Sequence, residues 1–317
     1  GAIIGLTLAS FGSFLVGMRL LTLPFKDVTR RKTDLTTADI LRFSMPVFSS
    51  SLYGFVIGSA SQFFVSRYLG VENFAMFANG YRELPIAGIV IGAVAGILLP
   101  EFSRMTKGGS DSKQYLVLWK NVVLKSAAVI YPFSLYCCIF APEIMGVLYG
   151  TVYREAADLF RIVTIINLVR IVPYGPIMFA LGKGKIFAKA HLVTALLLLG
   201  LDFLCVTFFP SLSAIAIIAT TTTVFCLVVL MVSTARLLNT GLSRLMPWKS
   251  MFKILSVSTF SCFLGSCAVN LIGVTRDFPA LLSGFLISIV IYLPLSYIAG
   301  INYARLLKPL VSTNQRK

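Results

Sequence analysis

Long apolar segments alternate with short polar segments along almost the whole chain of 317 residues. Nine of the apolar segments are roughly 20 residues long, the length that an α-helix needs to cross the hydrocarbon core of a bilayer. They lie at about 2–22, 46–65, 79–101, 122–143, 159–180, 187–208, 214–236, 252–272 and 279–300. The pattern predicts an all-α, polytopic membrane protein with about nine transmembrane helices. Hydrophobic residues form 57% of the sequence, more than a soluble domain of this size needs.

Most of the 28 basic residues lie in every second connection between the predicted spans. These connections contain Lys26, Arg30, Arg31, Lys32, Arg42, Arg104, Lys107, Lys113, Lys120, Lys125, Lys183, Lys185, Lys189, Arg236, Arg244, Lys249, Lys253, Arg305, Lys308, Arg316 and Lys317. The alternate connections have only Arg67, Arg154 and Arg276, each near an acidic residue. Because cytoplasmic loops retain Lys and Arg, we expect the N-terminus of this chain outside and the C-terminus in the cytoplasm. The net charge of +16 then reflects topology and contact with anionic membrane lipids rather than a nucleic acid partner.

Two basic, amphipathic connections divide the predicted spans into groups. In the first, residues 23–45, the part from Leu35 to Phe43 is typical of a helix on the cytoplasmic surface. In the second, residues 238–251, Trp248 stands beside Lys249, as is common at a membrane interface. We therefore expect one helix at 1–22, a cytoplasmic linker at 23–45, a six-helix bundle at 46–237, a cytoplasmic connection at 238–251, a helix pair at 252–300 and a basic cytoplasmic tail at 301–317. The first segment lacks the features of a signal peptide, so we interpret it as a span of a longer protein.

Cysteine and histidine provide no candidate metal or catalytic site. All six cysteines fall inside predicted spans, where they behave as small apolar residues. The single histidine, His191, stands alone. We expect no enzymatic activity and no cofactor.

Two spans carry small and polar residues at helical spacing. In the second span Gln62 continues a stripe begun by Ser44, Ser51, Gly58 and Ser59. Such a stripe either packs against other helices or lines a polar cavity. In the third span Gly88, Gly92 and Gly96 recur at every fourth position, which favours close packing against another helix.

The fifth span contains Arg170 near its middle and is interrupted by Pro173 and Pro176. A charge at that depth costs about 2.5–3.5 kcal/mol, so we expect Arg170 to face inward and meet either an intramembrane carboxylate or an anionic substrate. Asn167 and Tyr174 are expected to share its face, because the three residues stand at i, i+3 and i+7. Arg161 points the other way, near the outer end, where its side chain can reach the interface.

Arg82 and Glu83 are predicted one turn inside the outer end of the third span. Either they pair with charges on neighbouring helices, or Arg82 faces a central cavity. The candidate substrate-binding residues are thus Arg170, Arg82, Asn167, Tyr174 and Gln62.

Several short motifs resemble one family of transporters. They are Tyr81-Arg82-Glu83-Leu84-Pro85, the helix end Leu99-Pro100-Glu101-Phe102-Ser103-Arg104, the turn from Ala141-Pro142-Glu143-Ile144 to Leu148-Tyr149-Gly150, and the basic turn Ala180-Leu181-Gly182-Lys183-Gly184-Lys185. As a set they resemble the lipid-linked oligosaccharide and polysaccharide flippases of the multidrug/oligosaccharidyl-lipid/polysaccharide exporter superfamily. The resemblance covers residues 46–237 best.

The resemblance implies two six-helix bundles around a central cavity, with an added helix pair in some members. On that scheme the first span is the last helix of an N-terminal bundle whose first five helices are absent here. The implied function is translocation of an undecaprenyl-diphosphate-linked oligosaccharide across the bacterial cytoplasmic membrane for polysaccharide export. Arg170 and Arg82 would contact the head group. The implied partners are the lipid-linked glycan, membrane lipids, and a glycan polymerase or export machinery.

Two other functions stay open. A cation-coupled multidrug antiporter needs a mid-membrane carboxylate, whereas Glu83, Glu101, Glu143 and Asp202 are predicted near span ends. A membrane-embedded glycan polymerase needs catalytic or glycan-holding groups on a sizeable outer loop, and the sequence shows none.

Overall fold

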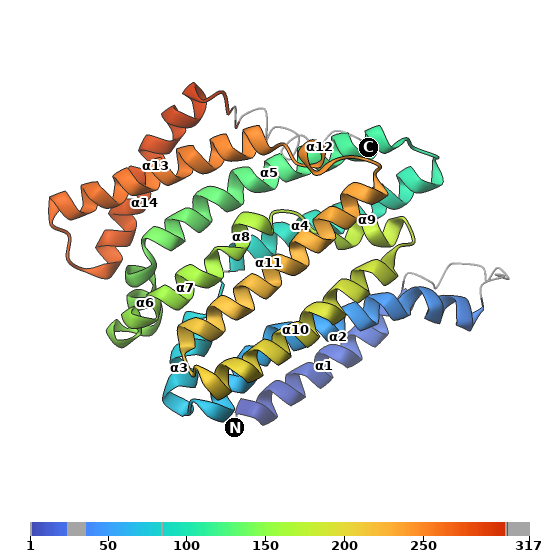
Figure 1. Cartoon of the computed structure of the whole chain (residues 1–317), viewed down its shortest axis with the longest axis horizontal. Helices are drawn as coiled ribbons and strands as arrows, with labels where there is room; N and C mark the ends of the chain where they lie inside the picture. The colour runs from blue at the N-terminus through green and yellow to red at the C-terminus, as the bar shows by residue number, and fades with distance from the viewer. Residues whose placement is uncertain (1, 24–35, 84, 302, 304–317) are drawn as a thin grey trace. The chain divides into compact units, whose positions relative to one another are not determined.

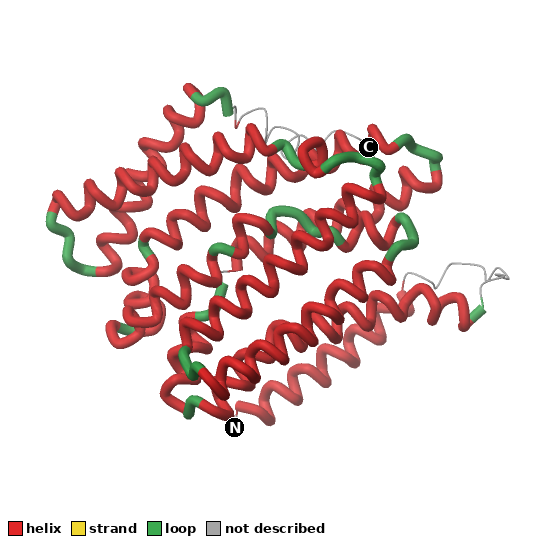
Figure 2. Tube along the Cα trace, in the orientation of Figure 1, coloured by secondary structure: helices red, strands yellow, loops and turns green. Residues whose placement is uncertain are grey.

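The computed structural model describes residues 2–23, 36–83, 85–301 and 303, and these residues form helices and no strand (Figures 1 and 2). The helices are α1 (Ala2–Thr22), α2 (Thr37–Tyr68), α3 (Val71–Gly80), α4 (Pro85–Lys107), α5 (Ser112–Ile139), α6 (Ala141–Tyr149), η2 (Thr151–Ala156), α7 (Ala157–Thr164), α8 (Ile166–Val169), α9 (Gly175–Ala180), α10 (Gly184–Phe208), α11 (Leu212–Leu237), α12 (Leu242–Leu245), α13 (Trp248–Ile272) and α14 (Asp277–Ile298). Within this described part, eight helices are long and apolar enough to cross a membrane: α1, α2, α4, α5, α10, α11, α13 and α14. The predicted all-α, polytopic membrane protein is confirmed.

The chain divides into two compact units, Gly1–Ser44 and Met45–Lys317. The smaller unit contains α1 and the start of α2, and the larger contains the remaining helices. Most of the predicted linker, including Lys26, Arg30, Arg31 and Lys32, lies outside the described residues, as do the C-terminal basic residues from Arg305 onward.

Helix α2 begins nine residues before the predicted span and passes through Pro46 without a break. Thr36 defines its start: the Thr36 hydroxyl accepts a hydrogen bond from the Asp39 backbone N–H at 3.2 Å, and the Asp39 carboxylate accepts one from the Thr36 N–H at 3.0 Å. This reciprocal pair satisfies two backbone donors that a helix N-terminus otherwise leaves free. The amphipathic segment is therefore the first part of α2 rather than a separate surface helix.

The final helix pair packs on the outer flank of the larger unit. Figure 1 shows α13 and α14 as a hairpin, with α13 along α5 and α14 meeting α6. The Tyr136 hydroxyl of α5 donates a hydrogen bond to the Leu281 carbonyl of α14 at 2.7 Å. Arg154 of η2 also forms an ion pair with Asp277 at 3.0 Å. These polar contacts tie the start of α14 to the bundle.

Two of the predicted spans are broken helices: the interruption predicted in the fifth span is present, whereas the prediction of a continuous third span was wrong. The span predicted at 159–180 consists of α7, α8 and α9, and the stretch between α8 and α9 contains Pro173, which cannot donate a backbone hydrogen bond to a helix. The span predicted at 79–101 consists of the end of α3, a non-helical stretch at 81–83, and α4, which begins at Pro85. Gly80 ends α3 where a Cβ atom would lie 2.8 Å from the Ala156 Cβ, so only glycine allows this approach.

The glycine face of α4 is open. No heavy atom of the described residues lies within 4 Å of where a Cβ would stand on Gly88, Gly92 or Gly96. The larger unit therefore supplies no helix to the close packing that the sequence predicted.

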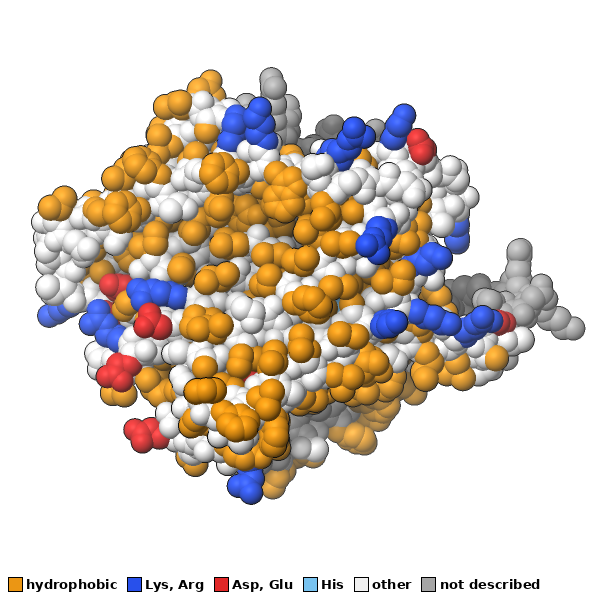
Figure 3. Space-filling model, in the orientation of Figure 1, with side chains coloured by type: hydrophobic (Ala, Val, Ile, Leu, Met, Phe, Trp, Pro, Cys, Tyr) orange, Lys and Arg blue, Asp and Glu red, His pale blue; other side chains and the backbone are white. Residues whose placement is uncertain are grey.

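Charged side chains are sorted along the molecular surface. In Figure 3 most Lys and Arg side chains gather toward the upper and right edges, and most Asp and Glu toward the lower left. Between them the surface is largely hydrophobic. Such a band between two polar ends is what a bilayer-spanning protein requires.

Candidate functional site

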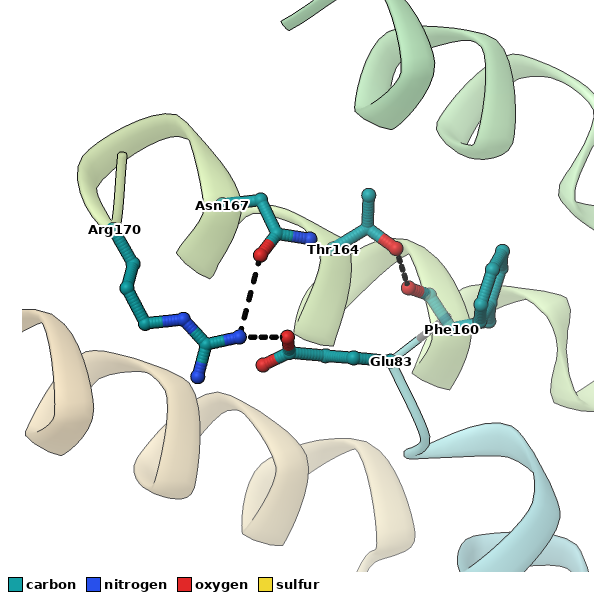
Figure 4. A network of polar contacts seen from close by, with 5 residues as sticks. All are labelled: Glu83, Phe160, Thr164, Asn167 and Arg170. Carbon is teal, nitrogen blue, oxygen red and sulfur yellow. Dashed lines mark hydrogen bonds and ion pairs between the residues drawn. The ribbon is translucent and has the colours of Figure 1, made fainter. Parts of the chain in front are cut away.

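The candidate site lies where the two broken helices meet. Glu83 occupies the non-helical stretch between α3 and α4, and Arg170 ends α8. The Arg170 Nη2 donates a hydrogen bond to the Glu83 carboxylate and forms an ion pair with it (Figure 4). The two residues are 87 positions apart in the sequence. An ion pair between helix breaks is therefore the centre of the site.

Local structure positions both charges. Helix α3 has only ten residues, so the chain leaves it well before it could complete a span, and Glu83 follows three residues later. On the other side α7 and α8 together carry the chain to Arg170, where the helix ends ahead of Pro173. Both breaks thus follow short helices, and α3 and α7 contact each other.

Asn167 contributes a longer contact to the same guanidinium. Its Oδ1 lies 3.5 Å from the Arg170 Nη2, and Figure 4 shows the amide oxygen facing the guanidinium. The Thr164 hydroxyl, by contrast, donates to the Phe160 carbonyl at 2.7 Å within its own helix. Asn167 is buried, and this contact places it beside Arg170.

The pair remains partly accessible. The Arg170 side chain is 32% exposed and the Glu83 side chain 20%. The Arg170 Nε is buried without a hydrogen-bond partner among the described residues. Part of the guanidinium fork is thus unused, which matters because Arg binds phosphate oxygens through parallel N–H donors.

The other predicted site residues lie elsewhere. Tyr174 is buried and packs against Trp119 of α5, with ring centroids 5.5 Å apart. The expectation of one shared face with Arg170 assumed a continuous helix, whereas the helix ends at Val169. Arg82 is exposed, and Gln62 is half-buried on α2. Neither forms a described hydrogen bond or ion pair.

A second buried acid was not expected from the sequence. Asp202 of α10 is fully buried, and its Oδ2 accepts a hydrogen bond from the Ser61 hydroxyl of α2 at 2.7 Å. Its Oδ1 has no partner among the described residues. Ser61 precedes Gln62 on α2. The polar side chain that this part of α2 buries is therefore Ser61, and not Gln62 as predicted.

Tyr81 and Thr220 form a further polar contact close to the ion pair. The two hydroxyls are 3.0 Å apart, and Tyr81 lies two residues before Glu83. Within the described residues no group of three His, Cys, Asp or Glu side chains converges on a point. The chemistry of the site is therefore that of one arginine, two carboxyl groups and several hydroxyls.

Comparison with known proteins gives one result over the first half of the chain. The polysaccharide biosynthesis protein family matches residues 2–158. Over these residues the chain is similar to that family. No curated protein and no solved structure matches the chain. The matched stretch includes Glu83 and ends before Arg170, so the second half of the site rests on the geometry alone.

Proposed function

We propose that the protein translocates an undecaprenyl-diphosphate-linked oligosaccharide across the bacterial cytoplasmic membrane for polysaccharide export. The observation that carries the proposal is the Glu83–Arg170 pair, a partly accessible arginine at a break between short helices. Similarity to the polysaccharide biosynthesis protein family over residues 2–158 supports the glycan as cargo. Discontinuous helices that meet at a charged site are a recurrent feature of transporters.

The diphosphate is the part of the cargo that Arg170 would recognise. The polar head has to pass through the protein while the lipid tail stays in the bilayer, because the glycan cannot be desolvated in hydrocarbon. In the resting state Glu83 neutralises Arg170 and Asn167 supports its position. A bound diphosphate would replace Glu83 as the partner of the guanidinium. Arg170 would then be paired with the diphosphate instead of with Glu83.

The helix breaks also give the site a means of changing shape. Backbone at 81–83 and around Pro173 lies outside regular helix, so small rotations there can reorient α3 and α7 against α4 and α9. Rocking of this kind would expose the head group to each side in turn. We place the basic edge of the larger unit on the cytoplasmic side, and we expect a glycan polymerase or the export machinery to take up the product.

Complementation tests this function. The gene is expressed in a strain that lacks its own lipid-linked glycan flippase, and surface polysaccharide is measured together with membrane abundance of the protein. We expect export to be restored by the unchanged protein and lost with Arg170→Ala at equal abundance. No export by the unchanged, correctly inserted protein would contradict the proposed cargo.

One observation favours cation-coupled transport, the second candidate. The carboxyl group of Asp202 is fully buried, receives one hydrogen bond from Ser61 and has no basic partner in the described part of the chain. A carboxyl group that is costly to ionise at such a position suits binding and release of a proton. If export is coupled in this way, Asp202→Asn should abolish its dependence on the proton gradient, and an unchanged dependence would remove this candidate.

A further inference from the structure

Two cavities run along the hairpin of α4 and α5, apart from the Glu83–Arg170 site. The first, of about 660 Å³, is lined at the hairpin end by polar and basic side chains that include Arg104 and Lys113. The second, of about 360 Å³, is lined mainly by Val, Ile, Leu and Ala side chains of both helices. Glu101 and Leu118 line both cavities. Together they form one groove, which is charged at the hairpin and apolar farther along; below we refer to it as the α4–α5 groove.

The charge in this groove is not balanced by the protein. Lys125 is half-buried and lines the apolar part. It forms no ion pair with any residue that the structure describes. Glu101 is already paired with Arg104 at 2.6 Å, so its carboxylate is neutralised. A lysine among apolar side chains within a membrane-spanning helix is costly unless an anion or the interface meets it.

A hydroxyl group on the groove wall also lacks a partner. Ser126 is 2% exposed, its Oγ has no hydrogen-bond partner among the described residues, and it follows Lys125 directly. The apolar wall around it is open: Ile97 is 65% exposed and Val129 is 38% exposed. A ligand here would need an anionic, hydrogen-bond-accepting head and an apolar tail.

We propose that the α4–α5 groove binds one anionic phospholipid of the leaflet at which the hairpin lies. Its phosphate pairs with Lys125 and lies toward Arg104 and Lys113, and one acyl chain covers Ile97 and Val129. Basic pockets between transmembrane helices hold lipid head groups in this way, and each buried methylene of the chain adds to binding. A soluble anion would fill only the charged end and leave the apolar wall uncovered. This site is independent of the proposed transport function.

Lipid retention on the purified full chain tests the proposal. The protein is exchanged into detergent with either phosphatidylglycerol or phosphatidylcholine of the same acyl chains, and the retained lipid is counted by native mass spectrometry. We expect one phosphatidylglycerol to be retained in preference to phosphatidylcholine. Lys125→Gln should lower that preference about fivefold, the factor expected for one basic residue near an anionic lipid. Lys125→Arg should keep it.

Two further variants separate the groove from general surface charge. Lys189→Gln removes an exposed lysine on α10, outside the groove, and should leave the preference unchanged. Ala93→Phe fills the apolar part and should reduce retention of both lipids while Lys125 stays in place. Equal retention of the two lipids, an unchanged preference in Lys125→Gln, or displacement of the lipid by millimolar inorganic phosphate alone would overturn the proposal.

Discussion

Glu83 and Arg170 join the two helix breaks of the bundle through a single ion pair (Figure 4). Each residue follows a helix too short to cross the membrane, so neither charge could be held at that position by a continuous span. Removing one partner of this half-buried pair leaves the other charge uncompensated, which is destabilising. The pair thus determines both the fold near the breaks and the chemistry available there.

The first prediction concerns Arg170. If the guanidinium binds the diphosphate, Arg170→Ala should weaken head-group binding by about 1.5–3 kcal/mol, or roughly ten- to a hundredfold in affinity. Arg170→Lys should recover only part of the loss, because lysine keeps the charge but not the fork of donors. Surface polysaccharide in the complementation strain, normalised to membrane abundance, is the measurement.

Arg161 provides the matched control for that experiment. It lies on α7 of the same broken span but pairs with Asp158, whose side chain is 75% exposed, at 2.7 Å. Its Nε also donates to the Cys138 carbonyl at 3.2 Å. Exposed ion pairs contribute about 0–1 kcal/mol and one hydrogen bond about as much, so Arg161→Ala should export normally. Normal export by Arg170→Ala at normal abundance would exclude Arg170 from head-group binding.

The second prediction separates ligand binding from a purely structural pair. Glu83→Arg combined with Arg170→Glu restores opposite charges across the two breaks, so membrane abundance should recover relative to either single variant. Export should not recover, because the guanidinium then belongs to position 83 and no longer to position 170. Abundance by immunoblot and export by polysaccharide staining are measured together. Recovery of both would show that the pair only stabilises the fold.

Sequence patterns predicted the presence of the long helices because each one satisfies the same local requirement, about 20 apolar residues in a row, although α5 begins ten residues before its predicted span. The bounds of α10 and α11 differ from the predicted spans by at most three residues at either end. The breaks were harder, since hydropathy alone does not show where a helix stops within an apolar segment. Proline predicted an interruption in the fifth span but not how far it would displace Tyr174 from Arg170.

Sequence patterns could not predict which residues far apart in the sequence contact each other. Arg170 was expected to meet a carboxylate or an anionic substrate, yet nothing local distinguishes Glu83 from Glu101 or Glu143 as that carboxylate. Asp202 was predicted near a span end, and it lies in the last third of α10. The sequence did not predict that its carboxylate is buried against Ser61. Such pairings depend on how helices pack, and that information is spread over the whole bundle.

The third prediction is topological. The alternation of basic connections places the α4–α5 hairpin in the cytoplasm and the η2 turn outside. In a variant without native cysteines, Ser110→Cys should resist a membrane-impermeant thiol reagent on intact cells, and Thr151→Cys should react. Both should react after permeabilisation. Labelling of Ser110→Cys but not Thr151→Cys on intact cells would reverse the orientation.

The last prediction concerns the attachment of α14. A Cβ atom on Gly284 would lie 2.3 Å from the Cζ of Phe140, a residue that is 3% exposed and cannot move into free space. Gly284→Ala should therefore lower the thermal stability of the protein in detergent, at about 1–3 kcal/mol for an overpacked contact. Gly200→Ala is the control, since nothing lies within 4 Å of a Cβ at that position. Combining Gly284→Ala with Phe140→Leu removes the clashing ring atoms and should recover part of the loss. If Gly284→Ala melts with the unchanged protein, as Gly200→Ala should, α14 does not pack on Phe140 as the structure shows.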